Sequence, residues 1–272
     1  MDTNYARVFQ HTGAVDKYEH VTYAPGSYAS RINERQRAYL RALVRRSFPN
    51  QRPDQRSDQR PDQRPDQRPN QGPDQRPVQH DFACGTGRAI RSLHGLVREA
   101  HGYDTSTDML AKAAEVGTRA QLHAIPADGP VPQPAPADGP ALVTVFRLLL
   151  NVDDTVRDRA LAFAAKALPD PGAGLLVIEN HGNANSLRHL RAHRLRGQRW
   201  FAELSHDDVD RLLARHGFET VERRGFSMVT QGWYERRGLD RIARGVDSAA
   251  SVLPGTDRYA VNVVYVARRL PR

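Results

Sequence analysis

From residue 78 onward the chain alternates between short apolar segments of strand type and longer amphipathic segments of helix type. The expected strands are 78–84, 100–103, 142–146, 175–179, 218–223 and 259–267. The expected helices are 88–99, 107–116, 154–168 and 205–216, the last opened by a capping-box pair, Ser205 and Asp208. This alternation predicts a doubly wound α/β fold, in which a mostly parallel sheet carries helices on both faces.

Residues 50–77 form a tandem four-residue repeat of the type Asp-Gln-Arg-Pro. A proline at every fourth position removes backbone donors, and the tract has no apolar side chain to bury, so we expect a disordered or extended loop. A docking tract for a partner is the alternative. Before the repeat, 30–47 has the apolar spacing of a helix, with its apolar residues on one side: Ile32, Tyr39, Leu40, Leu43 and Val44. The chain therefore divides into an N-terminal helical segment over 1–49, the repeat loop over 50–77 and an α/β domain over 78–272.

The net charge of +9 invites a nucleic-acid interpretation. The alternative is an arginine-rich composition, because only three of the 40 basic residues are lysine. A single cysteine, Cys84, excludes an internal disulfide framework and is typical of the cytoplasm. The longest apolar stretches are too short to cross a bilayer, and the N-terminus lacks the pattern of a secretory signal.

The segment Asp81-Phe-Ala-Cys-Gly-Thr-Gly-Arg88 stands where a strand gives way to a helix. Its two glycines allow a ligand to approach the main chain closely, and the start of the helix offers free backbone N–H groups. The next expected strand ends at Asp104, where a carboxylate can accept hydrogen bonds from a ribose. The pattern therefore favours a nucleoside-type ligand.

Two common nucleotide ligands fit less well. A dinucleotide site needs a small residue at the third position of its glycine motif, and Ile90 occupies that position. A triphosphate loop needs Gly-Lys-Ser/Thr, which the chain lacks. A ligand with a ribose and an amino-acid tail remains.

At this point the residues resemble a known family. The glycine segment, followed by Gly102-Tyr-Asp-Thr-Ser-Thr-Asp-Met-Leu-Ala-Lys-Ala113, is similar to the signature pair of class I S-adenosylmethionine-dependent methyltransferases. The resemblance continues through 143–151, 179–187, Gly217-Phe-Glu219 and the terminal strand, and covers most of 78–270. It implies a seven-stranded sheet with an antiparallel last strand, S-adenosylmethionine as cofactor and a small-molecule acceptor.

The resemblance also implies which residues bind the cofactor. The methionine part would be held by Asp81, Ala83, Gly85 and Gly87. Asp104 would take the ribose hydroxyls, with Thr105 and Met109 beside the adenine, whose amino group would face Asp128 or its duplicate Asp138. Phe146, Arg147 and Asn151 follow the fourth strand, on the side expected for the reactive methyl group.

The sequence departs from the family in its first strand. Gln79 and His80 precede Asp81 where apolar residues are usual, so we expect this strand to be short and weakly anchored. An acid frequent before the fourth strand is replaced by Ala141. A cofactor-binding protein without catalysis is therefore an alternative to an active enzyme.

Methyl transfer is an in-line displacement, so the protein mainly binds and aligns the reactants, and a base is needed only when the acceptor must lose a proton. His181 is the candidate base; the alternative is that it shapes a turn with Asn183. Tyr18, Tyr23 and Tyr28 are candidates for a lid or for packing. We expect no metal site at His189 and His193. We expect the residues that line the acceptor pocket to lie in the N-terminal segment and within 181–200 and 226–256. The arginines of 188–199 leave RNA open as a second substrate class.

Overall fold

The computed structural model describes residue 15 and residues 18–48, 74–189, 203–229, 231–236, 238–253 and 255–271. Of the repeat, only 74–77 lie in these ranges, so the predicted loop over 50–77 falls outside the described residues.

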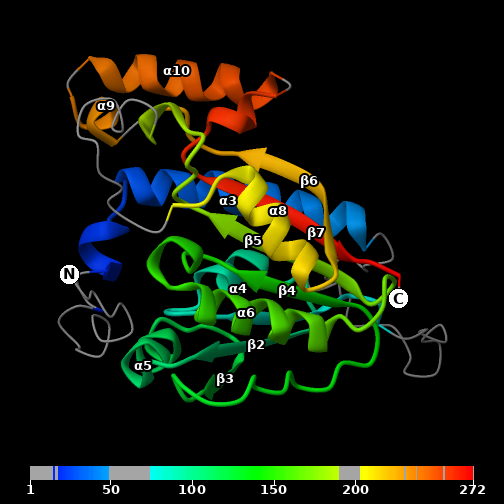
Figure 1. Ribbon diagram of the computed structural model, residues 1–272. Helices are drawn as coiled ribbons and strands as arrows, with labels where there is room; N and C mark the ends of the chain where they lie inside the picture. Colours follow the sequence, from blue (N-terminus) through cyan, green and yellow to red (C-terminus); the bar gives the residue numbers. More distant parts are fainter. Residues whose placement is uncertain are drawn as a thin grey trace, which may run out of the picture.

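Seven strands of the described chain form one sheet in the order β3-β2-β1-β4-β5-β7-β6 (Figure 1). Their bounds are β1 Val78–Phe82, β2 Glu99–Asp104, β3 Gln121–Ala124, β4 Ala141–Val145, β5 Gly174–Asn180, β6 Phe218–Gly225 and β7 Val263–Arg269. The first five pair in parallel, and β7 runs antiparallel to both β5 and β6. The predicted doubly wound α/β sheet with an antiparallel last strand is confirmed.

Helices cover both faces of this sheet (Figure 1). They are α3 Tyr28–Ser47, α4 Arg88–Leu93, α5 Thr107–Glu115, α6 Asp154–Ala167, α8 His206–Arg215, α9 Gln231–Glu235 and α10 Leu239–Val252. Single turns occur at η1 Tyr18–Thr22, η3 Leu149–Asn151 and η4 Thr256–Tyr259. Figure 1 shows α6 and α8 on one side of the sheet and α3 on the other, with α9 and α10 at the top of the view.

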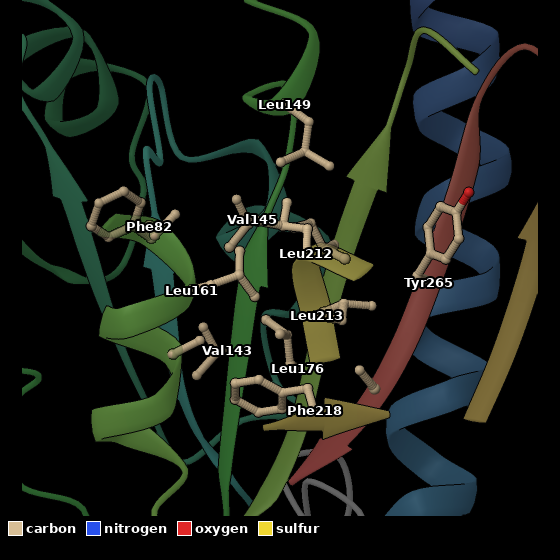
Figure 2. Packing of buried hydrophobic residues seen from close by; sticks show 14 of the residues in the cluster. Phe82, Val143, Val145, Leu149, Leu161, Leu176, Leu212, Leu213, Phe218 and Tyr265 are labelled. Atoms are coloured by element: carbon tan, nitrogen blue, oxygen red, sulfur yellow. The ribbon is translucent and has the colours of Figure 1, made fainter. Parts of the chain in front are cut away.

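Each face has its own apolar core. Figure 2 shows the side on which α6 and α8 pack, where Leu161 and Leu212 meet Val143, Val145 and Leu176 of the central strands. On the other side, α3 buries four of the residues predicted to share its apolar face: Ile32, Leu40, Leu43 and Val44. The N-terminal helix is therefore part of the α/β core.

Most predicted elements agree with the structure to within two residues, and the capping box of α8 is present. Two predictions were wrong in extent. The helix predicted over 88–99 ends at Leu93, because the chain turns through Gly95 at a φ of 82° and Glu99 already belongs to β2. The last strand, predicted from Tyr259, begins at Val263, because Tyr259 closes the η4 turn.

The prediction that the first strand is weakly anchored was wrong. All five residues of β1 are buried, and the strand pairs along its length with β2 and β4. Gln79 donates from Nε2 to Thr144 Oγ1 of β4 at 3.1 Å. His80 stacks on His101 of β2 with ring centroids 5.4 Å apart. Both polar side chains thus have partners on neighbouring strands, although Gln79 Oε1 accepts no hydrogen bond among the described residues, and a strand pattern does not reveal such partners.

The burial of His80 predicts a pH-dependent stability. Desolvation, with the nearby His101 and His123, lowers the pKa of His80 to about 4. The unfolded chain therefore takes up this proton near the ordinary pKa of 6.5 and the folded chain only near 4, so stability is retained above 6.5 and lost as the pH falls between these values. The loss is about 3 kcal/mol.

Asp81 opposes this effect. Burial raises its pKa to about 7, so its contribution to the free energy of unfolding is present at low pH and is lost as the pH rises. Comparing His80→Leu with the unchanged protein cancels Asp81. The free energy of unfolding of each protein is measured with urea at pH 7 and at pH 4. Between these two pH values, we expect the difference between His80→Leu and the unchanged protein to change by about 3 kcal/mol. His20→Leu, at an exposed histidine, is the control. Parallel pH curves for His80→Leu and the unchanged protein would contradict the expectation.

Candidate active site

One pocket opens at the carboxyl ends of the parallel strands, where open α/β sheets bind their ligands. Residues that follow β1, β2 and β4 line one part of it, and the end of β5 together with α3 lines another. The lining includes seven of the nine predicted cofactor-binding residues: Asp81, Ala83, Gly85, Asp104, Thr105, Met109 and Phe146.

The turn after β1 forms a cradle of main-chain atoms. Ala83 and Gly85 have φ values of 57° and 52°, in the left-handed region. A Cβ built on Gly85 would meet only Met109 Sδ, at 4.0 Å, so a side chain there would project into the space of a ligand. Gly87 has a different role: it caps α4, and a Cβ there would lie 2.5 Å from Thr118 Cγ2. Gly87 therefore permits packing and does not line the pocket.

Asp104 ends β2 beside this cradle. Its Oδ2 accepts the Gly85 N–H at 2.7 Å, and its Oδ1 accepts the Ser106 N–H at 2.9 Å. A third backbone N–H, that of Thr105, also hydrogen-bonds this carboxylate, which leaves about one acceptor position open. Burial raises the pKa of Asp104, although the backbone N–H groups oppose the rise. The carboxylate is thus fixed in orientation and able to accept a hydrogen bond from a ribose hydroxyl.

Asp81 lies deeper in the site and is 2% exposed. Thr144 Oγ1 donates to its Oδ1 at 2.6 Å. Desolvation raises its pKa to about 7, despite the threonine, and the charge of Asp104 adds to the rise. An ammonium group bound beside Asp81 would favour the carboxylate form. The amino group of an amino-acid tail fits this position.

The two candidates for the adenine amino group differ in place. Asp128 is exposed and does not line the pocket, but Ala127 next to it does. Asp138 lies at the other end of the strands, near their amino ends. Its backbone carbonyl accepts a hydrogen bond from Nη2 of Arg98, the residue just before β2. Of the two, only Asp128 belongs to the ligand-binding edge.

The three predicted catalytic residues form a chain of contacts. Asn151 Nδ2 donates to the Arg147 carbonyl at 2.8 Å and lies 3.2 Å from His181 Nε2. An amide nitrogen can only donate, so Nε2 is unprotonated. Burial, with the charge of Arg147, lowers the pKa of His181 well below its ordinary value. Of the three, Arg147 alone lines the pocket.

Two buried residues of the pocket were not predicted as site residues. Glu179, at the end of β5, is 1% exposed, and Gln36 of α3 is 6% exposed. Gln36 Nε2 donates to Glu179 Oε1 at 2.6 Å. A glutamine at a buried helix position was the available signal, but its partner stands 143 residues away in the sequence.

The tyrosines before α3 have separate roles. Tyr23 lines the pocket, and the Arg88 guanidinium lies 3.4 Å from its ring centroid. Tyr28 packs away from the pocket, with its hydroxyl donating to Ser227 Oγ at 2.9 Å. The side chain of Tyr18 lies outside the described part. Of the three ranges predicted to line the acceptor side, the N-terminal segment lines the pocket through α3 and the turn before it, and none of the described residues of 181–200 and 226–256 does.

Other sequence candidates have structural explanations. Cys84 is buried among Ile90, Ala100 and Leu110, and burial raises the pKa of its thiol, so it acts as a packing residue. Asn183 holds the chain after β5 by donating to the carbonyls of Arg258 and Ala260. Within the described ranges no group of three or more histidine, cysteine or acidic residues could hold a metal ion.

Comparison with known proteins agrees with this geometry. The family model described as methyltransferase domain matches residues 32–223. The chain belongs to the methyltransferase domain family. The match includes α3 as well as the glycine cradle and Asp104, and the resemblance to class I S-adenosylmethionine-dependent methyltransferases is confirmed. No curated protein sequence matches the chain.

Solved structures show the same fold. This methyltransferase is similar to magnesium protoporphyrin IX methyltransferase from Synechocystis PCC 6803 with bound S-adenosylhomocysteine, at a TM-score of 0.57 and 13% identity, over 99% of this chain and 100% of that one. A possible histamine N-methyltransferase from Thermotoga maritima gives a TM-score of 0.50 and 14% identity, over 95% and 99%. None of the helices described here is long and apolar enough to cross a membrane.

Proposed function

We propose that this methyltransferase transfers the methyl group of S-adenosylmethionine to an oxygen or nitrogen atom of a small-molecule acceptor. The observation that carries the proposal is that one pocket combines the cofactor cradle with residues of the N-terminal segment, Tyr23, Gln36 and Leu40. A pocket covered by a helix and a stacked tyrosine suits a small acceptor better than a polynucleotide. The 1–49 segment then acts as a fixed cap over the pocket, and 78–272 as the cofactor-binding domain.

The residues present fit the cofactor. Ala83 and the open Gly85 would bind its methionine chain, Asp81 its ammonium group and Asp104 its ribose. Thr105, Met109 and Asp128 would flank the adenine, and Phe146 would lie beside the methionine end. When bound, the sulfonium supplies an activated methyl group. The protein's part is to align the acceptor, exclude water and receive a proton where the acceptor loses one.

His181, in this proposal, positions Arg147 through Asn151. In His181→Gln the glutamine oxygen can still accept from Asn151, so we expect turnover within about threefold of the unchanged protein. In His181→Ala the Asn151 amide keeps the Arg147 carbonyl but loses its second acceptor, and we expect about a tenfold loss of turnover. A general base would behave differently: His181→Gln would lose roughly 100-fold or more and the acid limb of the pH profile. Initial rates across pH distinguish the two roles.

The experiment that tests the proposed function supplies the purified protein with methyl-labelled S-adenosylmethionine and fractionated cell extract. We expect label in a small molecule, identified by mass. Label in RNA, with RNA binding that weakens as salt rises, would replace the small acceptor by RNA. Cofactor binding with no labelled product in any fraction would favour a binding protein without catalysis.

A further inference from the structure

We propose that Glu179 accepts the hydrogen of the acceptor's nucleophilic atom, so that the acceptor carries an N–H or O–H group at the position that is methylated. This inference rests on the proposed function and deepens it by naming the chemistry of the acceptor. It starts from a carboxylate that is buried and yet borders the pocket.

Two hydrogen bonds hold the Glu179 carboxylate, and among the described residues no cationic side chain forms an ion pair with it. Gln36 Nε2 donates to Oε1, and the Arg147 backbone N–H donates to Oε2 at 3.0 Å. Both donors are neutral. Burying a carboxylate costs several kcal/mol when no opposite charge is paired with it. Each oxygen also keeps one acceptor position, which a proton donor in the pocket can use.

The contact between the Arg147 N–H and Glu179 depends on an unfavourable backbone conformation at Arg147. Its φ of 59° lies in the left-handed region, which non-glycine residues rarely adopt. Such strain costs about 1–3 kcal/mol and persists only where the surrounding structure fixes it. Here it directs the Arg147 N–H to Glu179, directly after β4, on the side expected for the reactive methyl group.

Gln36 orients the carboxylate from the other side, and its helix is firmly anchored. Arg35, the preceding residue, donates to the Phe226 carbonyl at 2.7 Å and to the Asp247 carbonyl at 3.1 Å. Asp247 is 2% exposed, and it also accepts the Met228 N–H at 2.7 Å. Rotation or sliding of α3 would break these bonds, so Glu179 has one orientation toward the pocket.

A lone pair of the acceptor nitrogen or oxygen forms the bond to the methyl carbon, and the bond from that carbon to sulfur breaks with its electrons remaining on sulfur. The sulfonium thereby becomes the neutral thioether of S-adenosylhomocysteine. The hydrogen of the acceptor atom passes as a proton to Glu179 and from there to solvent. Acceptors whose nucleophilic atom has no hydrogen gain nothing from this carboxylate.

The test uses Glu179→Gln, whose side chain has the same shape. Its oxygen can accept the Arg147 N–H, and its NH2 group can donate to Gln36 once the Gln36 amide turns to present its oxygen. Glu219→Gln, at an exposed acid of β6, is the control. The probes are benzylamine and para-cresol, with N,N-dimethylbenzylamine as a nucleophile that has no hydrogen on nitrogen. We expect the unchanged protein to methylate at least one protic probe and Glu179→Gln to lose at least about 100-fold in kcat, together with the acid limb of its pH profile.

Affinity for S-adenosylhomocysteine separates this inference from the proposed function. We expect Glu179→Gln to bind it within about twofold of the unchanged protein, because the cradle and Asp104 are intact. Failure of the unchanged protein to bind it would defeat the proposed function. Binding accompanied by equal rates in both proteins, by methylation of N,N-dimethylbenzylamine alone, or by reaction with none of the probes would overturn the role of Glu179.

Discussion

Asp104→Ala weakens the binding of S-adenosylmethionine by roughly 100-fold or more. The carboxylate offers its remaining acceptor position to the ribose, and a hydrogen bond to a charged group contributes about 1.5–3 kcal/mol. A loss of about 3 kcal/mol corresponds to roughly two orders of magnitude in Kd. The substitution also removes the acceptor of the Gly85 N–H, so the cradle loses the bond that holds it against β2. Both effects act in the same direction.

Calorimetric titration measures this effect, and Asp108→Ala is the matched control. Asp108 is an acid four residues further along, in the first turn of α5, and it does not line the pocket. We expect its affinity to remain within about threefold of the unchanged protein. Circular dichroism confirms that both variants are folded at the titration temperature. Equal affinities for Asp104→Ala and Asp108→Ala would show that the carboxylate of Asp104 does not bind the ribose.

Gly174→Ala is expected to have the largest effect on stability. Gly174 opens β5 with a φ of 145° and pairs with Ala141 of β4. A Cβ at this position would lie 1.7 Å from the Ala141 carbonyl oxygen, a backbone atom that cannot move without separating the two central strands. We expect the free energy of unfolding to fall by about 4 kcal/mol or more. Since many domains are stable by only about 5–15 kcal/mol, poor folding at 37 °C is the expected phenotype.

Gly172→Ala is the control for Gly174→Ala. It places the same methyl group two residues earlier, where no heavy atom lies within 4 Å of the added Cβ. Its expected change is within about 0.5 kcal/mol of the unchanged protein. Urea unfolding monitored by fluorescence and circular dichroism gives both values. Similar midpoints for the two variants would mean that the β4–β5 pairing tolerates the methyl group, against the geometry described above.

The cofactor half of the site was predictable because its signals are local in the sequence. The glycine turn and Asp104 each follow directly from a buried strand, and parallel strands bring their carboxyl ends to one edge. The resemblance implied a third strand before Asp128, but its position was not predicted, since the four residues of β3 are exposed or half-buried and carry no apolar pattern. α10 was not predicted either. This helix is held in place by its buried Asp247, which hydrogen-bonds Arg35 and Tyr234 on other elements, and contacts between elements cannot be read from the local sequence.

The acceptor half depends on pairs that sequence does not join. Glu179 meets Gln36 across 143 residues and Arg147 across 32. His181 was predicted as the base from its place after the fifth strand, but the direction of a side chain after a strand depends on the turn that follows. In the structure that turn brings His181 to Asn151, and Glu179 borders the pocket instead. A pattern can place a residue at an edge of the sheet, and packing decides which way it faces.

The central claim is that the bend after Cys84 and the carboxylate of Asp104 together hold a ligand with a methionine chain and an adenosine. Titration of the purified, folded protein with S-adenosylhomocysteine tests it most directly, because this product binds without being consumed. We expect saturable binding with one site per chain and no comparable binding of adenosine alone, which lacks the part contacted by the cradle. A folded protein that shows no heat of binding and no thermal stabilisation with S-adenosylhomocysteine would contradict it.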